Sequence, residues 1–373
     1  MNILVVAGEA SGDQHAADVV AALKARRPEL TFFGMGGPKL AAQGVELVHG
    51  AHEISVMGIV EVLPKVPRIL KVLGDLDRVA QQRKPACAIL VDIPDFNLRL
   101  AKRLKRAGIK VAYYVSPTVW AWREERTKII AERVDHMLCI LPFEEQFLRE
   151  RGVRATYVGN PVVEQVPPQA PPETFRKALG LAVERPVLAM LPGSRRSEIR
   201  RILPTLVKVA QQLTALHPGL QLAVPVAPGL PRELLATHFE GSGLEPHWVD
   251  GRAPEVVGAS DVAVVASGTA TLEAGLMRRP LVVVYSMARL SYFVALLMVK
   301  APFFSLVNIL AGRRVVPELL QDEMSPERVV AEVERLWQGP AREELLAGLD
   351  EVRAKLGPGG VAARAAEQVL ALL

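Results

Sequence analysis

Short apolar runs rich in β-branched residues alternate with longer amphipathic segments along nearly the whole chain, and this alternation constrains the fold most strongly. Such a rhythm is typical of βαβ units, in which a helix connects two parallel strands. We therefore predict an α/β fold with parallel sheets. In the N-terminal half, the expected strands are 2–7, 31–34, 86–92, 110–115, 136–140 and 156–158, and the expected helices include 12–27, 66–83 and 96–107. In the C-terminal half, the expected strands are 187–191, 220–225, 261–266 and 281–285.

A proline-rich break divides this alternation into two halves. Residues 167–172 read Pro-Pro-Gln-Ala-Pro-Pro, which fits neither a helix nor a central strand and behaves as a stiff, extended linker. A chain of 373 residues is also long enough for two cores. The simplest architecture is two doubly wound, Rossmann-like domains facing each other across a cleft. We expect these domains over 1–166 and 173–340, and C-terminal helices over 341–373 that pack back on the fold or exchange with a partner.

The composition suits a folded protein with anionic partners. Half of the residues are apolar, and Lys and Arg exceed Asp and Glu by 45 to 40. This excess favours phosphates, nucleotides or acidic lipid headgroups, and because no nucleic-acid-binding motif accompanies it, we expect no nucleic acid partner. Cys87 and Cys139 interrupt apolar runs, which favours two buried thiols in a reducing cytosol over a disulfide or a metal pair.

Two stretches bear on targeting. The N-terminus begins directly as a strand, without a basic segment or a cleavage site, so we expect no secretion signal. Residues 290–312 carry Lys300 as their single formal charge. A lysine in the middle of a spanning helix costs about 2.5–3.5 kcal/mol on insertion, and Pro302 would break the helix close by. We therefore predict a buried or interfacial pair of segments rather than a transmembrane span.

Several common site patterns are absent from the sequence or incomplete. Residues 34–39 resemble a dinucleotide fingerprint, but Lys39 stands where the third glycine belongs. The chain contains no P-loop or HExxH sequence, and its seven histidines lack the spacing of a metal pair. Asp75 and Asp77 form a DxD, but on a helix two such side chains point about 200° apart. We interpret them as solvated surface charge and predict neither a metal nor a cofactor.

Polar loops follow several of the expected strands, where open α/β sheets bind ligands. The first loop combines Gly8 and Gly12 with Glu9, Ser11 and Asp13. This loop either presents the N–H groups of a helix to an anion or is an ordinary turn that Asp13 caps.

The second loop, residues 92–97, places one carboxylate on each side of a proline. Asp95 is expected at a helix N-terminus, where the helix dipole favours the ionised form. An ionised carboxylate that faces a ligand can accept a hydroxyl proton as a general base. For Asp92 we favour a role as the helix cap.

Two loops in the C-terminal half have features of a phosphate site. The first is a glycine turn followed by arginines, which oppose the dipole of the helix that they open. A pyrophosphate bound there would relieve this conflict. The second is a small-residue turn that is either a phosphate and ribose site or a well-capped helix with an exposed glutamate. We assign Gly193, Ser194 and Arg195 of the first turn, and Ser267, Gly268, Thr269 and Glu273 of the second, to a bound nucleotide.

One further segment, residues 55–71, is largely apolar but carries Lys65, Arg68 and Lys71. Such a segment can lie in a lipid headgroup layer with its cations against phosphate. A core helix with basic edges is an equally good interpretation. The side chains assigned to membrane or acyl-chain contact are Val56, Met57, Ile59, Val62, Leu63, Val66, Ile69 and Leu70.

Taken together, these segments resemble the lipid-A-disaccharide synthase family nearly from end to end. The block around residues 120–123 is especially specific. The blocks that carry the resemblance are GEASGD at 8–13, VMGIVEVL at 56–63, DIPDFN at 92–97, YVSPTVWAWR at 114–123, LPFE at 141–144, LPGSR at 191–195, ASGTATLE at 266–273, NILAG at 308–312 and PELLQ at 317–321.

The resemblance implies a GT-B fold and an inverting glycosyl transfer. UDP-2,3-diacylglucosamine gives its sugar to the 6-hydroxyl of 2,3-diacylglucosamine 1-phosphate, which forms a β-1,6 disaccharide and UDP without a metal. Asp95 falls on the family's general base, Arg195 on the arginine at the donor diphosphate, and Asn308 on a donor-site residue. The N-terminal domain would face the acceptor and the membrane, and the residues assigned to the acceptor side are Glu9, Ser11 and Asp13.

The resemblance also implies a location. Residues 56–70 fall on the family's apolar surface for the membrane and the acyl chains, so the chain is expected to be cytoplasmic and peripherally associated with the inner face of the cytoplasmic membrane. Members of the family exchange C-terminal segments between protomers, which makes a homodimer one expected assembly.

The chain departs from the family's pattern at three positions. Asn160 stands where a histidine is usual, and Val307 and Ile309 flank Asn308 where a proline and a leucine are usual. Alternatives within enzymes are another GT-B transferase that uses UDP-N-acetylglucosamine and a UDP-sugar epimerase. An alternative from a different class is a non-catalytic, membrane-associated protein that binds a nucleotide sugar, against which Asp95 and Arg195 argue.

Overall fold

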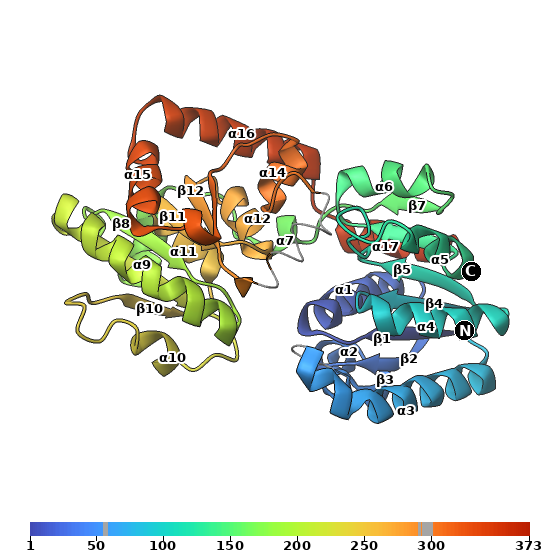
Figure 1. Cartoon of the computed structure of the whole chain (residues 1–373). Coiled ribbons are helices and arrows are strands. Elements are labelled where there is room, and N and C mark those ends of the chain that lie inside the picture. The colour runs from blue at the N-terminus through green and yellow to red at the C-terminus, as the bar shows by residue number, and fades with distance from the viewer. Residues whose placement is uncertain (55–58, 290–291, 293–300) are drawn as a thin grey trace. The chain divides into compact units, whose positions relative to one another are not determined.

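The computed structural model describes residues 1–54, 59–289, 292 and 301–373, and it forms two compact units that are each built on a parallel sheet (Figure 1). Unit 1 comprises Met1–Pro161 and Pro358–Leu373, and unit 2 comprises Val162–Gly357. The chain thus enters unit 2 just before the proline-rich run. The predicted α/β class with parallel sheets is confirmed.

Seven parallel strands form the sheet of unit 1, in the order β3-β2-β1-β4-β5-β6-β7. They are β1 (Asn2–Ala7), β2 (Thr31–Gly36), β3 (Glu46–Gly50), β4 (Cys87–Val91), β5 (Lys110–Tyr114), β6 (His136–Cys139) and β7 (Ala155–Tyr157). The central strands are apolar on both sides because each face packs on its own hydrophobic cluster. Val5 of β1, for example, pairs in register with Gly34 on one side and Ile89 on the other. The strand order reverses between β1 and β4, so the loops after these strands flank the topological switch point, where open sheets bind ligands.

The last helix of the chain returns to unit 1 and packs on its first helix. Val361, Ala365 and Val369 share a buried cluster with Ala16 and Val20, so the two ends of the sequence build one core. The helices of unit 1 are α1 (Ala10–Arg26), α2 (Pro38–Ala42), α3 (Ile59–Arg83), α4 (Pro94–Arg106), α5 (Arg126–Arg133), α6 (Pro142–Arg149) and α17 (Val361–Leu370), with a 3-10 turn at Ala51–Glu53.

The C-terminal group expected over 341–373 is divided between the two units. Helix α16 (Pro340–Leu356) belongs to unit 2, and only α17 packs in unit 1. Gly357 and Gly360 have φ of 69° and 83°, in the left-handed region that glycine adopts without strain. The helical path therefore breaks between these glycines.

Six parallel strands form the sheet of unit 2, in the order β10-β9-β8-β11-β12-β13. They are β8 (Val187–Leu191), β9 (Gln221–Val226), β10 (His247–Asp250), β11 (Val262–Ala266), β12 (Leu281–Tyr285) and β13 (Glu318–Leu320). The order reverses between β8 and β11, so their loops flank the second switch point. The other helices of unit 2 are α7 (Val162–Gln165), α8 (Pro172–Leu179), α9 (Arg196–Leu216), α10 (Glu233–Ala236), α11 (Ala253–Ala259), α12 (Thr269–Leu276), α14 (Leu306–Ala311) and α15 (Pro326–Trp337), with a 3-10 turn at Gln321–Glu323.

The proline-rich run is held against unit 2. The Gln169 side chain donates to the Leu276 carbonyl over 3.1 Å, and the Arg279 guanidinium donates to the Ala170 carbonyl over 2.9 Å. Helix α8 then begins at Pro172, because proline suits the first turn of a helix. Residues 167–171 lie outside helices and strands, as predicted, but Pro172 belongs to α8, and the run packs on unit 2 instead of linking two units.

Both cysteines are buried and free, as the sequence predicts. Burial raises the pKa of the Cys87 thiol to about 12 and also raises the pKa of Cys139, so neither thiol is reactive at neutral pH. Among the residues that the structure describes, the helices are too short or too polar to cross a bilayer.

Candidate active site

The turn after β4 is strained and well supported. Asp92 and Ile93 have φ of 53° and 39°, a left-handed conformation that costs about 1–3 kcal/mol at each non-glycine residue. The buried Asn97 amide donates to the carbonyls of Val91 (3.1 Å) and Asp92 (2.9 Å), and the Tyr113 hydroxyl also donates to the Asp92 carbonyl. A strained backbone that several hydrogen bonds hold in place is typical of a functional turn.

This turn presents Asp95 on the first turn of α4. The Asp95 side chain is 77% exposed, and Arg126 donates to its Oδ1 over 2.9 Å. Its second oxygen has no donor among the described residues. The expected capping role of Asp92 is wrong, since Ile93 is the N-cap residue and no side chain caps α4. Burial raises the pKa of the Asp92 carboxyl, which makes it a poor anion.

A pocket of about 410 Å³ lies beside Asp95 within unit 1. Its polar corner is formed by Glu9, Asp95 and Arg99. The rest of its wall is Gly8, Ile54, Val66, Ile69, Leu70, Leu73, Ile93, Pro94 and Phe96. The structure therefore brings the expected general base together with an acceptor-side residue and three of the residues expected to contact acyl chains.

Other residues of the expected acyl surface lie outside the part that the structure describes. This holds for Val56 and Met57, and for the side chains of Ile59, Val62 and Leu63. Ser11 is exposed on the first turn of α1 but does not line the pocket.

Asp13 is bound elsewhere. Its carboxylate is 2% exposed and accepts hydrogen bonds from the amides of Gly37 (2.7 Å), Lys39 (2.9 Å) and Leu40 (3.2 Å). Asp13 therefore caps α2, rather than the helix that contains it, and it does not line the pocket. A Cβ at Gly37 would lie 2.6 Å from this carboxylate, which explains the glycine-rich run that resembled a dinucleotide fingerprint.

The DxD of α3 is a pair of structural ion pairs. Asp75 accepts from His49 (3.2 Å) and Arg78, and Asp77 accepts from Arg103 (3.3 Å). The predicted divergence of the two carboxylates is confirmed, but the interpretation as solvated charge is wrong, because both are largely shielded by these partners. In the described part of the chain, no three His, Cys, Asp or Glu side chains gather as metal ligands would.

In unit 2, the turn after β8 closes around a carboxylate. Gly193 has φ of 111°, and Glu198 Oε2 accepts from the amides of Ser194 (3.1 Å) and Arg195 (3.2 Å). Glu198 Oε1 accepts from the Arg195 guanidinium over 2.7 Å. The side chain of Arg195 is 67% exposed and that of Glu198 is 10% exposed. Glu198 thus occupies the position that the sequence assigned to a pyrophosphate.

The turn after β11 leaves its tip open. The Ser267 hydroxyl donates to the Phe304 carbonyl over 3.0 Å, whereas Gly268 and Thr269 are exposed. Gly268 has φ of 156°, and no atom lies within 4 Å of where its Cβ would be. Burial raises the pKa of Glu273, whose carboxyl group has no hydrogen-bond donor among the described residues. A half-buried carboxyl group of this kind is suited to ligand hydroxyls.

Asn308 is completely buried and fully bonded. Its Nδ2 donates to the Val316 carbonyl (2.9 Å) and to Glu318 (2.8 Å). Its Oδ1 accepts from the amides of Val315 (2.7 Å) and Val316 (2.9 Å). An amide side chain has no capacity beyond these four bonds. In this structure Asn308 therefore fixes the segment between α14 and β13, and does not face a ligand.

The departure at Asn160 also has a structural explanation. Asn160 is 2% exposed, and its Nδ2 donates to the Ile140 carbonyl over 3.0 Å, which ties the loop after β7 to the end of β6.

In the tryptophan-rich block, Trp120 Nε1 donates to Glu144 over 3.1 Å. Burial raises the pKa of Glu144 to about 8, and its other oxygen accepts from the Leu141 amide at the start of α6.

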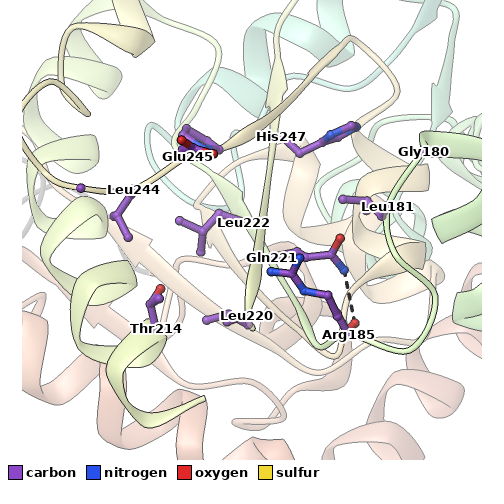
Figure 2. A pocket seen from close by; sticks show the side chains of 12 residues that line it. Gly180, Leu181, Arg185, Thr214, Leu220, Gln221, Leu222, Leu244, Glu245 and His247 are labelled. Carbon is purple, nitrogen blue, oxygen red and sulfur yellow. Dashed lines mark hydrogen bonds between the residues drawn. The ribbon is translucent and has the colours of Figure 1, made fainter. Parts of the chain in front are cut away.

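A second hollow, of about 490 Å³, lies at the amino ends of β8, β9 and β10 in unit 2 (Figure 2). Its polar side chains are used in holding the main chain: Gln221 donates to the Arg185 carbonyl (3.4 Å), and His247 contacts the Leu179 carbonyl (2.7 Å). Since ligands of open α/β sheets bind at the carboxyl ends of the strands, this hollow is not the candidate site.

Arg99, Arg126 and Glu198 lie at the candidate site but were not predicted from the sequence. The spacing of four residues from Asp95 places Arg99 on the same helix face and could have identified it. Glu198 stands three residues after Arg195, the N-cap of α9, and this capping-box spacing could have identified it. Arg126 reaches Asp95 from α5, and no local pattern predicts that contact.

The chain is similar to a single family along nearly its whole length. A family model described as lipid-A-disaccharide synthetase matches residues 3–356. The chain is 64% identical over 372 residues to the lipid-A-disaccharide synthase of Myxococcus xanthus, covering 100% of this chain and 97% of that protein. It is 40% identical over 372 residues to that of Geobacter sulfurreducens, with the same coverage.

Solved structures share the fold at low identity. The calicheamicin glycosyltransferase CalG4 gives a TM-score of 0.64 at 15% identity, covering 100% of this chain and 98% of that chain. Acinetobacter baumannii MurG gives 0.58 at 13% identity with the same coverage. A UDP complex of Staphylococcus aureus MnaA gives 0.63 at 13% identity, covering 99% and 94%. These similarities show that the fold is GT-B-like.

Proposed function

The chain belongs to the lipid-A-disaccharide synthase family, and we propose that it joins UDP-2,3-diacylglucosamine to 2,3-diacylglucosamine 1-phosphate. The products are the β-1,6 disaccharide 1-phosphate and UDP. The observation that carries the proposal is the pocket of unit 1, where an exposed carboxylate stands beside an apolar wall suited to a lipid acceptor.

Asp95 acts as the general base in this proposal. Arg126 holds one oxygen of its carboxylate, which leaves the other to accept the proton of the acceptor 6-hydroxyl. That hydroxyl oxygen then bonds to the donor's C1 as the bond from C1 to the UDP oxygen breaks on the opposite face. A single displacement of this kind inverts the configuration at C1.

Unit 2 binds the donor in this proposal. The Ser194 and Arg195 amides and the Arg195 guanidinium bind the diphosphate, and Glu198 gives up these donors when the nucleotide arrives. Arg195 and the amides stabilise the charge that develops on UDP in the transition state. The open turn with Ser267, Gly268 and Thr269 adds amides, and Glu273 accepts from the ribose hydroxyls. Asn308 contributes indirectly by fixing its segment.

The exposed side of α3 supports a peripheral position on the inner face of the cytoplasmic membrane. Val66 and Leu70 are exposed beside the exposed cations Lys65, Arg68 and Lys71. An apolar surface with such a basic border binds anionic lipid headgroups. Leu70→Glu is expected to release the protein from vesicles containing phosphatidylglycerol, and unchanged binding would contradict this surface.

The homodimer is part of the same proposal. Gly357 and Gly360 bound the break before α17, and exchange of α17 between protomers would reproduce its packing on α1. Light scattering of the purified chain is expected to give twice the mass of one chain, and a monomer at all concentrations would contradict the exchange.

The direct test supplies purified protein with both diacyl sugars and measures UDP. We expect UDP release that requires the acceptor and is unchanged by EDTA. The Asp95→Asn variant is expected to bind UDP normally and to lose transfer by roughly 10²- to 10⁴-fold, the contribution of a general base. No release by the unaltered protein would exclude the proposed reaction, and transfer surviving in Asp95→Asn would move the role of base to Glu9 in the same pocket.

A further inference from the structure

Arg99 lines the same pocket as Asp95 and lies one helical turn further along α4. Its side chain is exposed and forms no ion pair or hydrogen bond with any residue in the described part of the chain. Residues four apart on a helix share a face and are about 6 Å apart along the axis. The pocket therefore presents a carboxylate and a guanidinium side by side on one helix.

The other arginines around this pocket are neutralised by carboxylates. Arg126 pairs with Asp95, and Arg103 pairs with Asp77 over 3.3 Å. On α3, Arg68 pairs with Glu53. Among the residues that the structure describes, Arg99 thus has no protein partner for its positive charge, and it stands beside an apolar wall. An uncompensated guanidinium in such a place attracts an anion that the bound molecule itself carries.

We propose that Arg99 binds the phosphate monoester of the acceptor lipid and so fixes which end of the acceptor sugar meets Asp95. This inference rests on the proposed function, because that function supplies an acceptor with a phosphate on C1 and the reacting hydroxyl on C6. The ring carbons that carry these two groups, C1 and C5, flank the ring oxygen of one pyranose. The separation of Asp95 and Arg99 along the helix is of the same order as the width of that ring.

The guanidinium is well suited to this task. Its planar fork forms two parallel hydrogen bonds with a phosphate, which fixes orientation as well as affinity. When the phosphate is bound at Arg99, the acyl chains lie along Val66, Ile69 and Leu70, and the 6-hydroxyl lies at Asp95. A phosphate on a bilayer headgroup has the same chemistry, so the test separates the two sources.

The experiment measures KM and kcat for two acceptors in mixed micelles of fixed composition. One acceptor is 2,3-diacylglucosamine 1-phosphate, and the other is the same diacyl sugar without the phosphate. Arg99→Gln is expected to raise KM for the phosphorylated acceptor roughly 10- to 100-fold, the loss of a charge-assisted contact, with little change in kcat. For the acceptor without phosphate, Arg99→Gln and the unaltered protein are expected to have the same KM.

Two further variants make the result specific. Arg99→Lys keeps the charge but not the fork and is expected to recover part of the lost affinity. Lys102→Gln removes an exposed positive charge from the same helix outside the pocket and is expected to leave both KM values unchanged. Equal effects of Lys102→Gln and Arg99→Gln would overturn the inference, because they would indicate a general electrostatic effect.

The remaining outcomes also decide the question. If Arg99→Gln raises KM equally for both acceptors, phosphate recognition is excluded. If Arg99→Gln instead weakens binding to vesicles of phosphatidylglycerol and phosphatidylcholine and leaves the preference for the phosphorylated acceptor intact, Arg99 serves the bilayer and the inference is wrong. If the unaltered protein uses neither acceptor, the proposed function itself fails, and that result is distinct from both.

Discussion

Both units place a glycine turn between a strand and a helix, and both turns close around a carboxylate of the protein itself. In unit 1, the turn before α2 holds Asp13, which comes from α1 and is 2% exposed. In unit 2, the turn before α9 holds Glu198, which belongs to that same helix and pairs with the exposed Arg195. In both turns, main-chain amides donate to a carboxylate, but the surroundings of that carboxylate differ.

The difference indicates which turn can bind a ligand. Asp13 joins two helices, so removing its carboxylate would separate α1 from α2. Glu198 is only 10% exposed, but it binds the turn of its own helix and the 67% exposed Arg195, so we expect that a diphosphate could replace it without separating two helices. We therefore expect a glycine turn to bind phosphate only where the carboxylate that fills it can leave.

The largest expected effect is a loss of turnover when the turn of unit 2 is altered. Arg195→Ala is expected to lower turnover by roughly 10²-fold or more, because a preorganised charge partner of the leaving UDP is lost. Steady-state UDP release measures this. Arg200→Ala, which removes an exposed arginine one turn further along α9, is the matched control and should retain turnover. Near-normal turnover in Arg195→Ala would mean that the unit 2 turn is not the diphosphate site.

The second prediction concerns stability rather than activity. Asp13→Asn places an amide donor against backbone donors and is expected to lower the free energy of unfolding by about 3 kcal/mol. Thermal unfolding with and without denaturant checks this, and UDP affinity should not change. Asp18→Asn, on the exposed side of the same helix, should change stability by less than about 0.5 kcal/mol. If Asp13→Asn were as stable as the unaltered protein, the turn in unit 1 would not be a closed structural turn.

The smallest effect tests whether Glu198 competes with the nucleotide. Glu198→Gln can still accept from the turn amides but loses its charge, so UDP affinity is expected to rise roughly two- to fivefold, the loss of one competing ion pair with Arg195. Calorimetric titration measures it. Glu144→Gln, which alters the corresponding residue in the first turn of α6, should leave UDP affinity unchanged. A fall in affinity for Glu198→Gln would indicate that Glu198 positions Arg195 instead of competing.

The sequence predicts the central strands well and the edges poorly. The predicted bounds of β1, β8 and β12 agree with the structure, because these strands are continuous apolar runs between polar loops. The strands β3, β10 and β13 were not predicted. They lie at sheet edges and contain charged or polar residues, so their pairing depends on a neighbouring strand rather than on their own pattern.

For the site, local sequence identifies residues but not their partners. Asp95 and Arg195 were predicted from their places at helix starts, which follow from spacing alone. Asp13 and Asn308 were assigned to ligands, although the structure binds their side chains to the main chain. Asp13 joins elements that are 24–27 residues apart, and Asn308 holds a loop seven to eight residues further on; neither contact is encoded by a short motif.

The most direct test of this account is a crystal structure of the protein with UDP. We predict diphosphate oxygens within hydrogen-bond distance of the Ser194 and Arg195 amides and of the Arg195 guanidinium, with the Glu198 carboxylate displaced, while Asp13 keeps its three amide bonds. UDP bound away from this turn, or bound with Glu198 still on both amides, would contradict the account.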